Sequence, residues 1–177
     1  MPHQRAKITM NGKRMRSLYL LRHSGTLSTS ATGRDIDRRL SPDGIRNAEA
    51  VAERIAGSSP LPQVILTSPA TRARETAAFV TAEIDVRETI IPEIYEASAA
   101  SLVDVVRSIA VSIDAALMVG HNPGFGTIVE FFTGSAVAMH SPSVAKIMFD
   151  IDDWENAERH AGRLADLYSP AVSIQLR

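Results

Sequence analysis

Short apolar runs alternate along this chain with segments whose apolar residues recur at helical spacing. Strands that alternate with helices indicate an α/β domain, because each crossover between parallel strands is usually made by a helix. The predicted strands are Ser17–Leu21, Val64–Leu66, Val86–Ile90, Ala115–Val119, Val144–Ile151 and Arg163–Tyr168. The predicted helices run from Ser41-Pro42 to Gly57, then over Ala70–Ala82, Ser98–Ile109 and Phe125–Phe132. We therefore expect a three-layer α/β/α sandwich with a mostly parallel central sheet.

The length of 177 residues suits one domain that buries its own core. Residues 1–14 carry several basic side chains and precede the first strand, so we expect a disordered leader there and a single domain over residues 15–177. The chain has no cysteine, which excludes disulfides, thiolate catalysis and cysteine-based zinc sites. No apolar run reaches the ~18 residues of a membrane span. We expect a cytoplasmic protein with no membrane partner, and a monomer is favoured.

The charge balance and the motifs also exclude several classes of partner. A net charge of −1 gives no general attraction for nucleic acid, so any anion site must be built locally. The five histidines lack the spacings typical of zinc ligands, and no phosphate-binding loop of the nucleotide-binding type is present. We expect neither a metal ion nor another cofactor.

Three sharp turns that follow predicted strands carry the residues that could take part in a reaction. The first turn is Arg22-His23-Ser24, the second is Ser68-Pro69 with Arg72 shortly after, and the third is Gly120-His121-Asn122. In α/β sheets, ligands bind beyond the carboxyl ends of the strands. If the three strands are parallel neighbours, two arginines and two histidines converge on one patch.

Such a patch is suited to a phosphoryl group. The guanidiniums of Arg22 and Arg72 cannot lose their charge, and the free N–H groups of a helix that starts near Pro123-Gly124 add to an anion site. A pair of unit charges 4 Å apart gains about 4 kcal/mol at an effective dielectric of 20. A few such contacts outweigh the small negative charge of the whole protein.

The two histidines supply the reactivity. A neutral imidazole is a nucleophile, and neighbouring arginines favour the neutral form because like charges disfavour protonation. His23 follows its strand directly, so it is the better nucleophile, and His121 is better placed to stabilise charge during transfer. Phosphoryl transfer depends mainly on positioning and electrostatics, which cationic side chains can provide.

These segments resemble the histidine phosphatase (phosphoglycerate-mutase-like) superfamily, in particular its SixA-type phosphohistidine phosphatase branch. The resemblance runs in order from about Ser17 to Tyr168. Its motifs are Leu21-Arg22-His23-Ser24, the segment Ser68-Pro69-Ala-Thr-Arg72-Ala73-Arg-Glu-Thr76-Ala77, Val119-Gly120-His121-Asn122-Pro123-Gly124, Asp37-Arg38-Arg39-Leu40-Ser41-Pro42-x-Gly44, and Ile94-Tyr95-Glu96-Ala97. The resemblance implies that His23 forms a phosphohistidine intermediate, that Arg22, Arg72 and His121 complete the phosphate pocket, and that water hydrolyses the intermediate.

The chain departs from the superfamily pattern in two places. Ser24 replaces the usual glycine after the nucleophile, so its side chain could contact the substrate, as could Asn122. The general acid of larger members has no clear counterpart, although Glu96, or Glu93 as a second option, lies in the corresponding region. A phosphohistidine releases imidazole, a good leaving group that needs little acid catalysis. His140, before Ser141-Pro142, is interpreted as a loop histidine rather than a pocket residue.

Three functions follow from these observations. The first is a metal-independent phosphatase for a phosphohistidine protein, through an intermediate on His23. The second is a phosphatase for small phosphomonoesters with Glu96 or Glu93 as the acid, and the third is a regulatory module that binds phosphate without turnover. The expected partner is thus a phosphorylated protein or a small phosphorylated molecule.

Overall fold

The computed structural model of the protein describes Gly12 and residues 14–170. The main elements are β1 (Met15–Arg22), α1 (Pro42–Ala56), β2 (Val64–Thr67), α2 (Thr71–Ile84), β3 (Glu88–Ile90), α3 (Ala99–Arg107), β4 (Ala115–Gly120), α4 (Gly124–Thr133), β5 (Ser143–Asp150) and β6 (Gly162–Tyr168). Three short 3₁₀ helices are η1 (Asp35–Asp37), η2 (Pro92–Ile94) and η3 (Trp154–Asn156). Most of the expected leader lies outside the described residues, and its last residue, Arg14, forms an ion pair of 2.9 Å with Asp114.

The six strands form one sheet in the order β3-β2-β4-β1-β5-β6. The pairs β3–β2, β2–β4 and β4–β1 are parallel, and β5 is antiparallel to both β1 and β6. Five strands therefore share one direction, which confirms the mostly parallel sheet. Only β5 is reversed, because residues 134–142 return to the carboxyl end of β1, where Ser143 pairs with Arg22.

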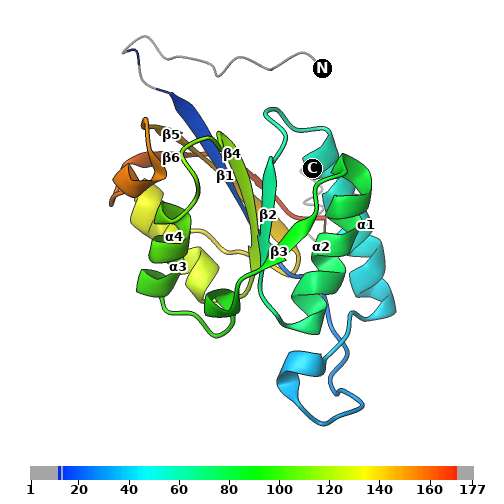
Figure 1. The fold of residues 1–177 in the computed structure, drawn as a ribbon. Helices are drawn as coiled ribbons and strands as arrows, with labels where there is room; N and C mark the ends of the chain where they lie inside the picture. The colour runs from blue at the N-terminus through cyan, green and yellow to red at the C-terminus, as the bar shows by residue number, and fades with distance from the viewer. Residues whose placement is uncertain (1–11, 13, 171–177) are drawn as a thin grey trace, which may run out of the picture.

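Helices cover both faces of the sheet, so the three-layer architecture is confirmed (Figure 1). Alternate residues of the central strands point to opposite sides. Leu18 and Met118 pack with α3 and α4, whereas Leu21 and Val119 pack with α1 and α2. The central strand β4 is buried along its whole length. A rigid sheet therefore ends at the turns that carry the predicted site residues.

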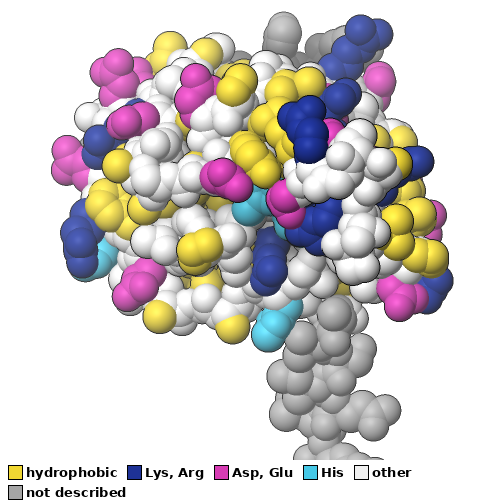
Figure 2. All heavy atoms as spheres, turned by 90° about the horizontal axis from the view of Figure 1, so that it is seen from below, with side chains coloured by type: hydrophobic (Ala, Val, Ile, Leu, Met, Phe, Trp, Pro, Cys, Tyr) yellow, Lys and Arg dark blue, Asp and Glu magenta, His cyan; other side chains and the backbone are white. Residues whose placement is uncertain are grey.

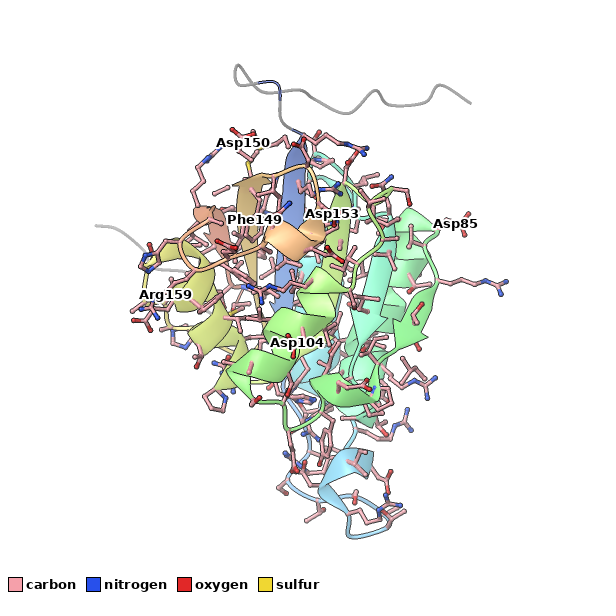
Figure 3. The ribbon with its side chains drawn as sticks, turned by 60° about the vertical axis from the view of Figure 1, so that its left-hand side comes forward. Asp85, Asp104, Phe149, Asp150, Asp153 and Arg159 are labelled. Carbon is pink, nitrogen blue, oxygen red and sulfur yellow. The ribbon has the colours of Figure 1, made fainter. Side chains whose placement is uncertain are left out.

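Two segments differ from the sequence-based prediction. The third strand is only Glu88–Ile90 rather than Val86–Ile90, because it lies at the sheet edge and pairs with β2 over three residues. No strand or helix is predicted between β1 and α1, but this segment contains η1 and is tied together by the bridge between Thr26 and Leu40. This segment projects beyond the carboxyl ends of the strands (Figures 1 and 3).

The opposite end of the sheet is closed by a buried arginine. Arg16 is fully buried, lies over the Trp154 ring at 5.5 Å, and donates hydrogen bonds to the carbonyls of Ile151, Ile113, Val111 and Asp152. The Phe149 ring packs edge-on against Trp154, and Asp153 follows at the start of η3 (Figure 3). Among the described residues, no helix is both long and apolar enough to span a membrane.

Candidate active site

Three neighbouring strand ends bring the predicted site residues together. Strands β2, β4 and β1 are adjacent, and the backbone N–H groups of His23 and Ser68 both donate to carbonyls of β4, each at 3.0 Å. As a result, the ring centroids of His23 and His121 lie 5.0 Å apart. Figure 2 views this end of the sheet and shows histidine, basic and acidic side chains gathered near its centre.

The hydrogen bonds of His23 define which ring nitrogen can react. Nδ1 lies 2.7 Å from the carbonyl oxygen of Ser24, which can only accept, so Nδ1 carries the proton. Nε2 is then unprotonated and accepts a hydrogen bond of 3.3 Å from Nε of Arg72. Desolvation lowers the pKa of His23 to about 4, with a smaller contribution from the positive charges of Arg72, Arg22 and Arg38. The imidazole is therefore neutral at pH 7, with its free lone pair on Nε2.

Arg72 lies in the first turn of α2 and is 5% exposed. Its Nη1 donates to the carbonyl of Asp35 at 2.8 Å, and its Nη2 donates to the Asp35 carboxylate at 2.9 Å. Asp35 is not among the predicted site residues, because it lies in a segment for which no strand or helix is predicted. Its position two residues before the Asp37-Arg38-Arg39 motif was the only available signal.

Arg22 reaches the site from the end of β1. Its Nη1 donates to the carbonyl of Met139 at 2.6 Å, so the segment before β5 fixes the guanidinium. The same segment supports the nucleophile, because the Ser141 hydroxyl donates to the backbone carbonyl of His23 at 2.7 Å. Within residues 14–170, the buried Nε of Arg22 has no hydrogen-bond partner. One N–H of Arg22 is therefore left unsatisfied by the described part of the chain.

His121 follows β4 and is oriented by Ser68. The two side chains meet at 2.8 Å between Nε2 and Oγ, and the same Oγ accepts a hydrogen bond from the N–H of Ala70. A serine hydroxyl has one proton and two lone pairs, so besides accepting from Ala70 it can donate to Nε2 or accept from it. Where it donates, the imidazole proton lies on Nδ1, a buried atom with no other partner in the described chain. Desolvation, followed by the charges of His23 and Arg72, lowers the pKa of His121 to about 3. In this tautomer, neutral His121 can donate one hydrogen bond from Nδ1.

Two predicted substrate contacts are engaged in the fold instead. Ser24 is fully buried, and its hydroxyl donates to the carbonyl of Gly44 at 2.7 Å, so this side chain is held within the fold. The Asn122 amide donates to the Met139 carbonyl and accepts from the N–H of Gly126 at the start of α4. Asn122 therefore fixes the turn, although it also lines the cavity described next.

A cavity of about 450 Å³ opens beside the histidines. Arg72, His121 and Glu96 line it together with Tyr95 from the segment after η2. Glu93, the second candidate acid, lies exposed in η2 and does not line this cavity. His140 is exposed in the loop before β5. Within the described residues, no group of three histidine, aspartate or glutamate side chains could hold a metal ion.

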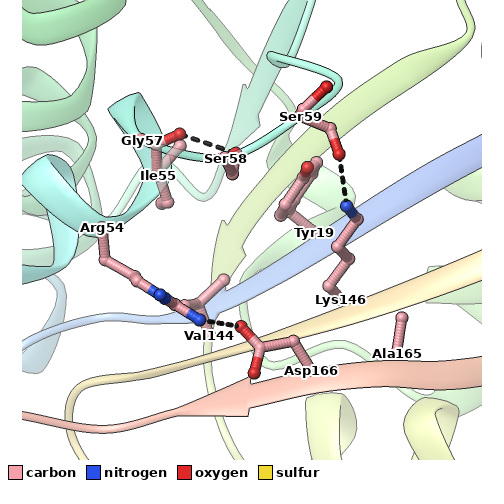
Figure 4. A pocket seen from close by; sticks show the side chains of 10 residues that line it. All are labelled: Tyr19, Arg54, Ile55, Gly57, Ser58, Ser59, Val144, Lys146, Ala165 and Asp166. Atoms are coloured by element: carbon pink, nitrogen blue, oxygen red, sulfur yellow. Dashed lines mark hydrogen bonds and ion pairs between the residues drawn. The ribbon is translucent and has the colours of Figure 1, made fainter.

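A second cavity, of about 380 Å³, lies between α1 and strands β5 and β6 (Figure 4). Its cations already have partners, because Arg54 pairs with Asp166 at 2.7 Å and Lys146 donates to the carbonyl of Ser59 at 2.6 Å. It contains none of the predicted site residues. Of these two cavities, only the one beside His121 is lined by predicted site residues.

Comparisons with known proteins agree with this geometry. Residues 18–108 match the family model of the histidine phosphatase superfamily (branch 1). An uncharacterized chloroplastic protein of Arabidopsis thaliana is 29% identical over 174 residues, which cover 90% of this chain and 80% of the relative. An uncharacterized protein of Mycobacterium leprae is 32% identical over 101 residues, which cover 57% of this chain and 62% of the relative.

Solved structures share the fold at low sequence identity. A Nakamurella multipartitia protein assigned as phosphohistidine phosphatase SixA superposes with a TM-score of 0.81 at 22% identity, over 89% of this chain and 98% of that one. The protein histidine phosphatase SixA in complex with tungstate gives 0.76 at 18% identity, over 88% and 97%. A mycobacterial glucosyl-3-phosphoglycerate phosphatase gives 0.64 at 17% identity, over 86% and 98%.

Proposed function

Because the chain belongs to the histidine phosphatase superfamily, we propose that it is a phosphatase that transfers a phosphoryl group from its substrate to Nε2 of His23 and then to water. The observation that carries this proposal is the tautomer of His23. Its Nδ1–H is held by the Ser24 carbonyl, so the lone pair of Nε2 faces the pocket beside Arg72. The low pKa of His23 keeps that lone pair free at pH 7.

In the first step, the lone pair of Nε2 attacks phosphorus and a new P–N bond forms. The bond from phosphorus to the leaving group breaks, and the leaving group takes the bonding electron pair. Arg22 and Arg72 bind the phosphoryl oxygens, and Nδ1–H of His121 donates to one of them. These donors are held by Met139, Asp35 and Ser68 before the reaction begins, so little reorganisation is needed.

In the second step, water attacks the phosphorus of phosphohistidine. The P–N bond breaks and its electron pair returns to Nε2, which regenerates neutral His23 with the proton still on Nδ1. Both hydrogens of the water leave with the product as dihydrogen phosphate. The Ser24 carbonyl keeps the proton on Nδ1, so the ring leaves as a neutral imidazole.

We propose a phosphohistidine protein as the substrate. An imidazole whose second nitrogen is protonated leaves as a neutral molecule, so no acid has to deliver a proton. The cavity places few acids near the leaving group, since Glu96 is the only carboxylate among its described lining residues. This position of Glu96 also supports the second candidate, a small-phosphomonoester phosphatase in which Glu96 acts as the acid.

A labelling experiment tests the proposal. The protein is incubated with a histidine-containing phosphoprotein carrying labelled phosphate, in the presence of a chelator. We expect acid-labile label on the wild type and release of phosphate, no label on His23→Ala, and normal labelling of His140→Ala, which changes an exposed histidine nearby. If the wild type binds phosphate but is never labelled and releases none, the protein is a phosphate-binding module and the proposal fails.

The two substrate classes are separated by changing the carboxylates. Glu96→Gln, with Glu93→Gln as the matched control outside the cavity, is assayed on an aryl phosphate, an alkyl phosphate and the phosphohistidine protein. The phosphohistidine proposal expects all three activities to survive in both variants. A selective loss on the alkyl phosphate in Glu96→Gln supports the phosphomonoester alternative, because an alkoxide leaving group depends on an acid.

A further inference from the structure

We propose that Asp35 is a positioning residue, which holds the guanidinium of Arg72 so that Nε–H faces the nucleophilic nitrogen of His23, and that Tyr95 holds Asp35 in turn. The inference rests on the proposed phosphoryl transfer to His23, and it assigns a role to η1, which projects beyond the sheet (Figure 1). Asp35 does not react and acts only through Arg72.

The donors of Arg72 are divided between Asp35 and the pocket. A guanidinium has five N–H donors in one rigid plane. Asp35 takes one from Nη1 with its backbone carbonyl and one from Nη2 with its carboxylate, while Nε–H points to His23. Because Asp35 holds both terminal nitrogens, it fixes the plane and the direction of Nε–H. The second hydrogens of Nη1 and Nη2 remain for phosphoryl oxygens.

Both oxygens of the Asp35 carboxylate are themselves fixed. Oδ1 accepts from Nε of Arg38 at 2.8 Å, and Oδ2 accepts from the Tyr95 hydroxyl at 3.2 Å as well as from Arg72. Arg38 is anchored by the Thr26 hydroxyl at 2.7 Å and by the carbonyl of Leu27. The carboxylate therefore cannot rotate without breaking contacts to three side chains, those of Arg38, Arg72 and Tyr95.

Tyr95 connects this clamp to the second histidine. Its ring lies edge-on to His121, with the centroids 5.6 Å apart, while its hydroxyl bonds to Asp35. One chain of contacts therefore runs from His121 through Tyr95 and Asp35 to Arg72 and ends at His23. A shift of Asp35 would disturb the group beside the nucleophile and one wall of the cavity together.

Asp35 acts here as a fixed negative charge rather than as a proton donor. Desolvation would raise the pKa of its carboxyl group, but hydrogen bonds from Arg38 and Arg72 and the charges of both arginines outweigh it, so the pKa lies below its ordinary value. The ionised carboxylate also offsets part of the positive charge around the phosphate. The contrasting hypothesis is that Asp35 only competes with phosphate for Arg72.

The test compares Asp35→Asn with Asp37→Asn, which changes another aspartate of the same 3₁₀ helix. Asp37 accepts from the Thr32 hydroxyl and pairs with Arg34 at 3.8 Å, away from the site. With a phosphohistidine protein as substrate, we expect kcat of Asp35→Asn to fall about tenfold to a hundredfold, since a small misplacement of a catalytic group has effects of this size. We expect KM to stay close to wild type and Asp37→Asn to be unchanged. Tyr95→Phe should show a smaller fall in kcat.

A second readout follows the orientation of Arg72 itself. In the ¹⁵N-labelled wild type with inorganic phosphate, we expect a resolved Nε–H resonance of Arg72 that is lost or broadened in Asp35→Asn and kept in Asp37→Asn. A lower KM with unchanged or higher kcat in Asp35→Asn would show competition and overturn the proposal. So would an unaltered resonance, or an equal loss of activity in Asp37→Asn. If wild type itself is never phosphorylated, the proposed function fails, but the resonance still decides whether Asp35 orients Arg72.

Discussion

Nε of Arg72 and Nε2 of His23 face each other at 3.3 Å. A guanidinium nitrogen can only donate, so this contact requires an unprotonated Nε2. The Ser24 carbonyl can only accept, so its contact with Nδ1 independently places the proton there. In the proposed mechanism, the cation that binds the phosphoryl group therefore also keeps the nucleophile in its reactive form. When the substrate binds, the Nε–H of Arg72 can exchange its hydrogen bond to the lone pair of His23 for one to a phosphoryl oxygen.

The rate of phosphorylation of His23 should be nearly independent of pH around neutrality. Protonation of Nε2 removes the lone pair, and the pKa of His23 is lowered to about 4, mainly by desolvation. We expect the single-turnover labelling rate to be constant between about pH 6 and 8 and to fall only as the pH approaches 4. A midpoint near the ordinary histidine pKa of about 6.5 would show that the imidazole is not desolvated as described.

The stability of the fold should decrease in mild acid for the same reason. Unfolded His23 takes up a proton near its ordinary pKa of 6.5, whereas the folded side chain does so only near 4. Between these values the unfolded state binds more protons, so the free energy of unfolding should fall by up to about 3 kcal/mol as the pH drops from 6.5 to 4. Denaturant titrations at several pH values should show a smaller change of the unfolding free energy with pH in His23→Asn. The change in His140→Asn should equal that of the wild type.

Ser24 should contribute to stability more than to substrate binding. Its hydroxyl is buried against the Gly44 carbonyl, while its backbone carbonyl holds Nδ1 of His23. Ser24→Ala removes only the first contact, so we expect a loss of about 1 kcal/mol in unfolding free energy with KM unchanged. A raised KM with unchanged stability would mean that the hydroxyl contacts the substrate.

Much of the fold and of the site could be predicted from local sequence patterns. The buried strands show as apolar runs, and Ser41-Pro42 marks the start of α1, where Ser41 caps the helix as expected. Arg22, His23 and His121 could be placed because they follow such strands directly. The end of a buried strand can be recognised in the sequence, and it also has a fixed place at the edge of the sheet.

The supporting contacts could not be predicted, because they connect segments far apart in the chain. Asp35 meets Arg72 across 37 positions, and Met139 meets Arg22 across 117. Met139 contributes only a backbone carbonyl, so its side chain carries no signal of this contact. The hydrogen bond from the Ser24 hydroxyl to the Gly44 carbonyl could not be predicted either, since the approach of Gly44 depends on tertiary packing.

Ser68 should affect catalysis through His121. Without the hydroxyl, the His121 ring loses the 2.8 Å contact between Nε2 and Oγ, which in the proposed mechanism holds its proton on Nδ1. We expect Ser68→Ala to lower kcat about tenfold or more, by analogy with the loss of a preorganised donor. Ser143→Ala is the matched control, because Ser143 is also buried and donates to a backbone carbonyl, that of His140. Similar activity losses in both variants would indicate a general effect of removing a buried hydroxyl.

Gly44 should be indispensable for the turn that carries His23. A Cβ atom at this position would lie 1.9 Å from the carbonyl oxygen of Gly25, a backbone atom that cannot move without moving the turn. We expect Gly44→Ala to lower the unfolding free energy by roughly 1–3 kcal/mol, as overpacking does. It should also reduce labelling of His23, because Gly25 lies two residues beyond the nucleophile.

The matched control for this substitution is Gly57→Ala at the other end of α1. There a Cβ atom would make only ordinary contacts, the nearest at 3.6 Å to the carbonyl of Glu53. We expect Gly57→Ala to keep its activity and its stability, or to gain about 0.4–1 kcal/mol from the reduced freedom of the unfolded chain. The comparison needs thermal unfolding and labelling of both variants. If Gly44→Ala folds with wild-type stability and labels His23 at the wild-type rate, then α1 does not hold the turn in place. The support of the turn would then come from the contacts of His23 with β4 and Ser141 and of Ser24 with Thr76.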